Sequence, residues 1–466
     1  MKQINHTKNN WVTAYLLLLC NLCLAQSEQL TFNSFLNTIK TEHPLALRAA
    51  NNTDYANAQY KAAKGNYDPV LNSSVESKQF KSLNYFTYGE AELKQPLFTS
   101  QYLKMGYQYG QGIKLNPENL TPSEGLPYAG VEVSLLQGLL FDKRRGEIIK
   151  SRSYIDFYEA EQKIQLNDLL FIASNTYIDA VYANKVNSIY NYFEHLASQR
   201  LTAINELTVI GEKAALDTIE ASIFLQGRLL EKQASEIEKV KRLNEILALR
   251  MANESSKSAF LISDSLEQLY LLSLHAASSM LLSESSVNPI LAQYTAKQKI
   301  LETDTRLKKE MIKPVLNVGY NFLSDSKSTF ISMNPNNYKW NATFAFPLFL
   351  RKPIHEYKMA KIVAQNNEFE FLNKQSQFNF KRKYIANTLG VVSEQISNAQ
   401  KAAAYSKILL EAEKIKFMNG ESSLFLLNSR ENKWLETELK LAEYKLKFTK
   451  TILELIYIDG NLKYEL

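Results

Sequence analysis

Cysteine is nearly absent from this 466-residue sequence, which contains only Cys20 and Cys23. Both lie in an N-terminal stretch typical of a secretory signal peptide, with a basic start, an apolar core and a small residue at Ala25. We therefore expect residues 1–25 to be removed, with a buried N-terminal helix as the alternative. The rest of the chain would then have no disulfide bond and no thiol chemistry.

The residue patterns of an enzyme are missing too. The five histidines are scattered, and the sequence has no phosphate-binding glycine loop and no cluster of metal-ligand residues. We therefore predict no catalytic activity, no cofactor and no bound metal. The formal charge of +6 falls to +4 without Lys2 and Lys8, which is too small and too dispersed to predict a nucleic-acid partner.

Long hydrophobic runs are also lacking. Beyond the signal, charged residues interrupt each apolar stretch before it reaches the roughly 20 residues of a transmembrane helix. A secreted chain of this kind is soluble, attached to a surface, or part of a β-barrel in an outer membrane.

Proline is absent from residues 141–251, and glycine occurs there only at Gly146, Gly211 and Gly227. Between the first two glycines, apolar residues recur at steps of four and three: Leu166, Leu170, Ala173, Tyr177 and Ala180. This spacing predicts a soluble helix close to 100 Å long, far beyond the usual helix length of roughly 10–14 residues. We expect the chain to reverse direction at Gly211.

A second proline-free segment follows Pro353, with Gly420 in its middle. Its apolar stripe alternates strictly between steps of four and three: Leu435, Leu439, Ala442, Leu446, Thr449, Leu453 and Ile456. The average period of about 3.5 residues is that of a coiled coil. We predict a second helical hairpin that turns at Gly420.

Two short patterns repeat at one spacing. Pro69-Val70-Leu71-Asn72 recurs as Pro314-Val315-Leu316-Asn317, and His43-Pro44 corresponds to Asn288-Pro289, both 245 residues apart. The matches indicate an internal duplication, with chance as the alternative.

After each copy the apolar period changes to two. Apolar and aromatic residues then alternate with polar or small ones at Leu103, Met105, Tyr107 and Tyr109, at Leu316, Val318, Tyr320 and Phe322, and at Trp340, Ala342, Phe344, Phe346 and Leu348. The alternation favours strands of a membrane barrel, with a soluble β-sandwich as the alternative. The second half has room for two strands and the first for two or four, which is too few to close a barrel around water. Closure therefore calls for several protomers, and we expect Tyr107, Tyr109, Tyr320 and Phe344 to face lipid.

The predicted fold is mixed and mostly α-helical. Its segments are a signal peptide (1–25), a first repeat (26–252, with strands over about 70–140 and a helical hairpin over about 142–252), an inserted equatorial segment (253–288) and a second repeat (289–466, with strands over about 314–350 and a hairpin over about 354–458).

This arrangement resembles the TolC family of outer-membrane efflux channels over nearly the whole mature chain. The two glycine turns carry most of the resemblance. Val209-Ile210-Gly211, followed by Leu216 to Ala221, is similar to the family's first periplasmic tip, and Phe417-Met418-Asn419-Gly420, followed by Leu424 to Ser429, is similar to its second. Gln95-Pro96-Leu97-Phe98 and Phe346-Pro347-Leu348-Phe349 are similar to its strand ends.

The resemblance implies a homotrimer whose strands form one shared β-barrel in the outer membrane and whose coiled-coil helices form an α-barrel across the periplasm. It implies a passive export duct that works with a periplasmic adaptor protein and an inner-membrane pump. The tips at Gly211 and Gly420 would contact the adaptor, and a gate would lie close to them.

The gate residues depart from the family pattern. Asp217 is kept, but Phe417 stands where the archetype has a tyrosine and cannot donate its hydrogen bond. Leu426 and Ser429 replace the two aspartates that ring the pore, which leaves Asp217 and Glu220 as the carboxylates of the tip. We therefore expect closure to depend on apolar packing of Phe417, Leu424 and Leu426.

Two other functions stay open at this stage. One is a periplasmic or surface coiled-coil interaction protein with a soluble β domain. The other is a heavy-metal efflux channel of the same fold, which the lack of a methionine or cysteine cluster disfavours.

Overall fold

The computed structural model describes residues 29–251, 261–280, 288–324 and 335–460. The predicted signal peptide lies outside these residues. The chain divides into two compact units, each built from both halves of the sequence. The first unit comprises Met1–Arg48, Ile164–Asn288 and Phe378–Leu466, and the second comprises Ala49–Lys163 and Pro289–Gln377.

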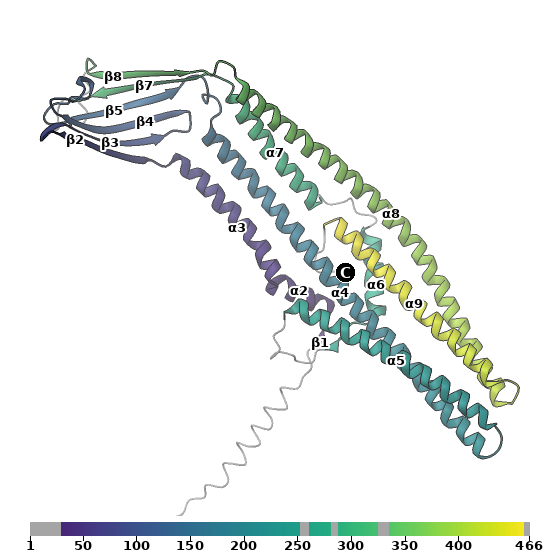
Figure 1. Ribbon diagram of the computed structural model, residues 1–466. Coiled ribbons are helices and arrows are strands. Elements are labelled where there is room, and N and C mark those ends of the chain that lie inside the picture. Colours follow the sequence, from purple (N-terminus) through teal and green to yellow (C-terminus); the bar gives the residue numbers. More distant parts are fainter. Residues whose placement is uncertain (1–28, 252–260, 281–287, 325–334, 461–466) are drawn as a thin grey trace, which may run out of the picture. The chain divides into compact units, whose positions relative to one another are not determined.

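The order helix, strands, helical hairpin occurs twice, as the internal duplication predicts (Figure 1). The first half contains the helices α2 (Phe32–Glu42), α3 (Pro44–Lys64), α4 (Lys143–Val209) and α5 (Ala215–Arg250). The second half contains α7 (Pro289–Glu310), α8 (Arg351–Met418) and α9 (Leu424–Ile458). Between the halves lie β6 (Leu261–Ile262), which pairs in parallel with β1 (Gln29–Leu30), and α6 (Leu266–Met280). The short 3₁₀ turns η2 (Gly65–Tyr67) and η3 (Pro117–Asn119) complete the order.

One six-stranded antiparallel sheet, in the second unit, contains all the longer strands (Figure 1). In spatial order they are β2 (Val70–Phe80), β3 (Leu83–Pro96), β4 (Gln101–Gln111), β5 (Leu126–Ser134), β7 (Val315–Leu323) and β8 (Tyr338–Ala345). The first half therefore supplies four strands and the second half two. Because β2 and β8 lie at the two ends of this order, the sheet of one chain is open at both edges.

Strand ends differ from the sequence expectation where the backbone turns. The sequence predicts strands up to about residue 140 in the first repeat, but β5 ends at Ser134. Leu135 N–H still bonds to Leu316 O at 2.8 Å, and the chain then turns at Gly138, whose φ of +85° suits glycine.

The two faces of the sheet differ in chemistry. Strand pairing places Leu103, Val131, Tyr320 and Trp340 in one row across β4, β5, β7 and β8, and all four side chains are exposed. The opposite face has a polar row in which Lys104 pairs with Glu132 and Lys94 lies 3.5 Å from the same carboxylate. This separation of apolar and polar faces agrees with the predicted alternation.

Tyr128 fixes the register of the polar face. Its ring lies across Gly106 on the neighbouring strand, where an added Cβ would be only 2.5 Å from the ring carbon Cζ. The Tyr128 hydroxyl reaches Glu90 Oε1 at 2.8 Å and Glu92 Oε2 at 2.9 Å on β3. Glycine at position 106 is thus required by the close approach of an aromatic ring.

The core of the first unit is organised around Tyr177 of α4. Its buried ring lies 5.5 Å from Phe32 and 5.6 Å from Phe35, and its hydroxyl lies 2.8 Å from both Leu30 O and Asp264 Oδ2. Burial and the Asp264 hydrogen bond raise the pKa of Tyr177. The predicted apolar stripe of α4 is buried around this ring, whose hydroxyl connects Leu30 to Asp264.

Candidate functional site

The two hairpin turns have the same local geometry. Gly211 and Gly420 have φ of +82° and +78°, and each closes a helix in a Schellman arrangement. Glu212 N–H bonds to Leu207 O at 2.9 Å, and Glu421 N–H bonds to Lys416 O at 2.9 Å. A Cβ added at either glycine would meet no atom within 4 Å, so positive φ alone accounts for both glycines.

The helices restart differently after the two turns. Ser423 caps α9, because its hydroxyl accepts a hydrogen bond from Leu426 N–H at 3.3 Å. At the start of α5, Ala214 offers no side-chain cap, and Asp217 lies in the first turn. A carboxylate at this position interacts favourably with the positive end of the helix dipole. Asp217 therefore has a local role in the protomer.

A groove of about 740 Å³ lies between the two tips. The lining residues come from α4, α8, α9 and the two turns: Leu196, Gln199, Arg200, Ala203, Ile204, Leu207, Glu212, Lys213, Lys414, Phe417, Met418, Asn419, Gly420 and Leu427. Lys213 Nζ lies 4.4 Å from the centre of the Phe417 ring and so connects the first tip to the second. A cation over an aromatic face is attractive without any hydroxyl. This contact joins the first tip to the second at Phe417.

Next to the groove, a small cluster of apolar side chains packs the two hairpins together. Ile204, Ala221 and Leu424 are buried there, and Phe417 packs against them. Leu426 lies outside this cluster, with 37% of its surface exposed. In the single chain the helical step from Leu424 to Leu426 points the two side chains in different directions, and the expected part of Leu426 in the gate stays a prediction.

About three helical turns behind the tips, charged residues are buried between three helices. Arg200 of α4, Arg228 of α5 and Glu431 of α9 meet there, and we call them the arginine–glutamate junction. Glu431 is 0% exposed. Its Oε2 pairs with Arg200, whereas its Oε1 lies 3.8 Å from Arg228 Nε. Burial, together with repulsion from Arg228, lowers the pKa of Arg200 to about 10.

Polar neighbours complete this junction. Arg200 Nη1 donates to Asn428 Oδ1 at 2.6 Å, and Asn428 Nδ2 lies 3.4 Å from Glu220 Oε1. Arg228 donates to Glu231 Oε2 at 2.6 Å and to Asn432. Glu220 is therefore drawn into contact with α9 within the protomer.

Sequence reasoning missed the junction. The one signal for it is that Glu431 lies at helical spacing between Leu427 and Leu435, on the buried face of α9. A charged residue on the buried face of a helix predicts a partner of opposite charge that is also buried. The identity of that partner depends on helices that are distant in the sequence.

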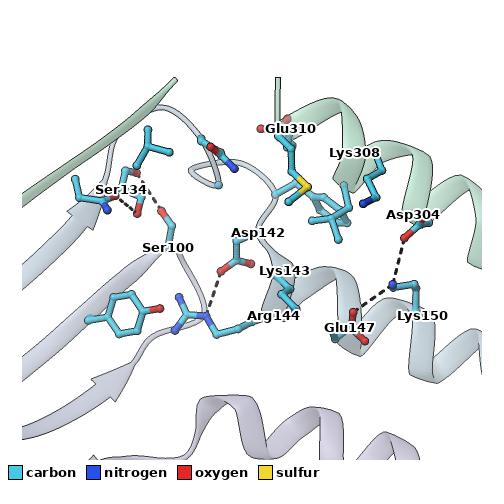
Figure 2. Close-up of a pocket in the computed structure, with 18 residues that line it drawn as sticks. Ser100, Ser134, Asp142, Lys143, Arg144, Glu147, Lys150, Asp304, Lys308 and Glu310 are labelled. Carbon is cyan, nitrogen blue, oxygen red and sulfur yellow. Dashed lines mark hydrogen bonds and ion pairs between the residues drawn. The ribbon is translucent and has the colours of Figure 1, made fainter. Parts of the chain in front are cut away.

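A second cavity, of about 670 Å³, lies where β4, β5 and β7 meet α4 and α7 (Figure 2). Figure 2 shows ion pairs inside it: Lys150 contacts Glu147 at 3.2 Å and Asp304 at 3.4 Å. Burial would lower the pKa of Lys150, but the two carboxylates outweigh it and raise that pKa. The pair between Lys150 and Asp304 connects α4 to α7. We therefore interpret the charged residues of this cavity as structural contacts between the two helices.

Comparison with known proteins decides the fold. No family model matches the sequence, and no curated protein matches it. The CmeC outer-membrane channel of Campylobacter jejuni superposes with a TM-score of 0.63 at 14% identity, over 92% of this chain and 85% of that one. VceC of Vibrio cholerae gives 0.62 at 11% identity, over 92% and 96%. The open state of the Neisseria gonorrhoeae MtrE channel gives 0.63 at 11% identity, over 93% and 90%. This chain has the fold of these outer-membrane channels.

The resemblance to TolC-like channels is thereby confirmed at the level of the fold. The channel fold accounts for the two long hairpins and for a sheet whose apolar and polar faces are separated. Among the described helices, none combines the length and the apolar character needed to cross a bilayer. Within the same described residues, no group of three or more histidine, cysteine, aspartate or glutamate side chains could hold a metal ion.

Proposed function

We propose that this protein is a passive export duct in the outer membrane that extends into the periplasm as a homotrimer. The observation that carries the proposal is the six-stranded sheet, which is apolar on one face, polar on the other and open at both edges. A sheet with open edges is not stable in lipid, because unpaired backbone groups are costly there. Pairing β8 of one protomer with β2 of the next would close a barrel around a wet interior.

The helices support the same assembly. Large apolar side chains are exposed along α8, for example Phe369, Leu372, Phe380, Tyr384, Tyr405 and Ile408. A patch of this length is unusual on a monomer and is typical of an interface. We propose that neighbouring protomers cover it when the helices form the periplasmic barrel.

The tips are the proposed site of regulation and docking. The groove between them is apolar and has the basic rim residues Lys213 and Lys414. It suits a helical hairpin of a periplasmic adaptor that presents apolar and acidic side chains. An inner-membrane pump would supply the energy for transport, and Gly211 and Gly420 would lie at the adaptor contact. The gate would comprise Phe417, Asp217, Glu220 and Leu426.

Two measurements on the full-length purified protein test this proposal. Outer membranes extracted in detergent should yield a trimer that persists in unheated electrophoresis samples and dissociates on boiling. The same material should produce discrete conductance steps in a planar lipid bilayer. A monomer recovered from the soluble periplasmic fraction would instead favour the coiled-coil interaction protein with a soluble β domain.

A further inference from the structure

The arginine–glutamate junction contains two cations around one anion. The Arg200 and Arg228 side chains are 8% and 5% exposed, and Glu431 is fully buried. Arg200 forms an ion pair with Oε2 of Glu431. The other oxygen, Oε1, and Arg228 Nε are both buried and have no hydrogen-bond partner, although they lie only 3.8 Å apart. A buried donor and a buried acceptor thus face each other across a contact that is slightly too long.

A second arrangement of the same three residues lies within a small displacement. If α5 and α9 approached by about 1 Å, Arg228 Nε would reach the 2.7–2.9 Å distance of a charged hydrogen bond. The arginines belong to the α4–α5 hairpin, and Glu431 belongs to the α8–α9 hairpin. Which of the two arginines pairs with the Glu431 carboxylate therefore depends on how one hairpin lies against the other.

We propose that Glu431 is exchanged between the two arginines when the tip of the α8–α9 hairpin slides across the α4–α5 hairpin, away from α4 and toward α5. Arg200 holds the carboxylate in the present state, and Arg228 takes it over when the α8–α9 hairpin moves. The buried carboxylate keeps a cationic partner in both states, so the movement avoids the large cost of an unpaired buried charge. The inference rests on the proposed channel function and adds to it a switch behind the tips.

The exchange makes a prediction that a structural ion pair does not make. If the junction only stabilised the fold, replacing either arginine would change the open probability in the same direction. If Glu431 is exchanged, Arg200→Gln removes the partner of the closed state, and Arg228→Gln removes the partner of the open state. The first variant should raise the open probability by about tenfold, and the second should lower it by a similar factor, as is typical of allosteric coupling.

The main test measures open probability in planar bilayers for the full-length protein, with Arg242→Gln as the matched control. Arg242 lies on α5 and bonds to Glu238 and Glu245 of its own helix at 2.8 and 3.0 Å, so its loss should leave gating unchanged. Arg200→Lys and Arg228→Lys keep the charge and lose the fork geometry; they should give weaker effects of the same two signs. Equal signs for the two arginines would overturn the exchange.

A second readout does not depend on conduction. Spin labels at Glu212→Cys and Glu421→Cys, in the predicted cysteine-free mature chain, report the distance between the exposed tips. Arg200→Gln should shift the distances to larger values, and Arg228→Gln should leave them at the wild-type values. Identical distances in the wild type and both variants would refute the exchange even if the wild type conducts. A wild type that forms no pores would refute the proposed function, and the label distances would still decide the exchange.

Discussion

Asp142 stands at the junction of the sheet and α4, where it makes three charged contacts. Its Oδ1 accepts from Arg145 N–H at 3.0 Å and from Arg145 Nε at 2.9 Å, and its Oδ2 accepts from Arg144 Nε at 3.2 Å. Burial alone would raise the pKa of Asp142, but the hydrogen bonds from the two arginines outweigh it and lower that pKa. The carboxylate thus stabilises the folded state at neutral pH.

The sign of the pH dependence follows from this lowered pKa. A carboxyl with a lowered folded-state pKa stabilises the protein fully above its unfolded value of about 3.9, and the benefit is lost as the pH falls through the folded value. Asp142→Asn should therefore reduce the free energy of unfolding by about 1–3 kcal/mol at pH 7 and by much less at pH 2. Thermal unfolding at both pH values checks this, with the exposed Asp156→Asn as control. An equal loss at both pH values would contradict it.

The gate prediction also belongs to single residues. Asp217→Ala should change the resting conductance little, because the contact of a half-exposed carboxylate with a helix end is worth about 1 kcal/mol or less. Phe417→Ala should increase it, because the cavity left behind loosens the cluster with Ile204 and Leu424, and because Lys213 loses its aromatic partner. Single-channel recording compares the two variants. An open Asp217→Ala pore beside a closed Phe417→Ala pore would show that the gate is polar.

At the scale of the elements, the two faces of the sheet permit a matched comparison. Tyr320 lies on the apolar face of β7, and its neighbour Asn321 points to the polar face. Tyr320→Lys should destabilise the barrel by about 2–4 kcal/mol if the residue lies near the bilayer midplane. Asn321→Lys should be tolerated better, because its side chain lies on the polar face, which would line the proposed wet interior. The temperature at which the assembled protein dissociates in electrophoresis samples measures both effects, and equal temperatures would mean that the register is shifted.

Regular elements could be predicted from the sequence because their periods persist over many residues. The stripe from Leu435 to Ile456 and the alternation from Leu316 to Phe322 each place apolar residues on one face, so their periodicity alone locates the helix and the strand. The strand ends could not be predicted, because Gly138 sets the turn after β5 by its backbone angle. The junction at Glu431 could not be predicted either, because its partners lie more than 200 residues away in sequence.

At the scale of the whole molecule, the duplication makes the two hairpin turns equivalent. Gly211 and Gly420 share a positive φ and an open surrounding, so the cost of a side chain at either is purely conformational. Gly211→Ala and Gly420→Ala should each destabilise the fold by about 1–2 kcal/mol, and the corresponding asparagine variants should cost less. Chemical unfolding of the four variants checks this. Clearly unequal alanine effects would indicate that one tip has a further constraint.

The open edges of the sheet also have a consequence for biogenesis. A newly secreted chain presents two long rows of unsatisfied backbone donors and acceptors, on the 11-residue β2 and the 8-residue β8. Such rows invite pairing with any extended peptide, and a lone protomer is therefore prone to aggregate. If the chain is secreted and shares a barrel as proposed, neighbouring chains must meet before or during entry into the bilayer. The rate of maturation should then rise more steeply than linearly with the amount of chain synthesised, and a chaperone that shields the edges would be most useful when synthesis is slow.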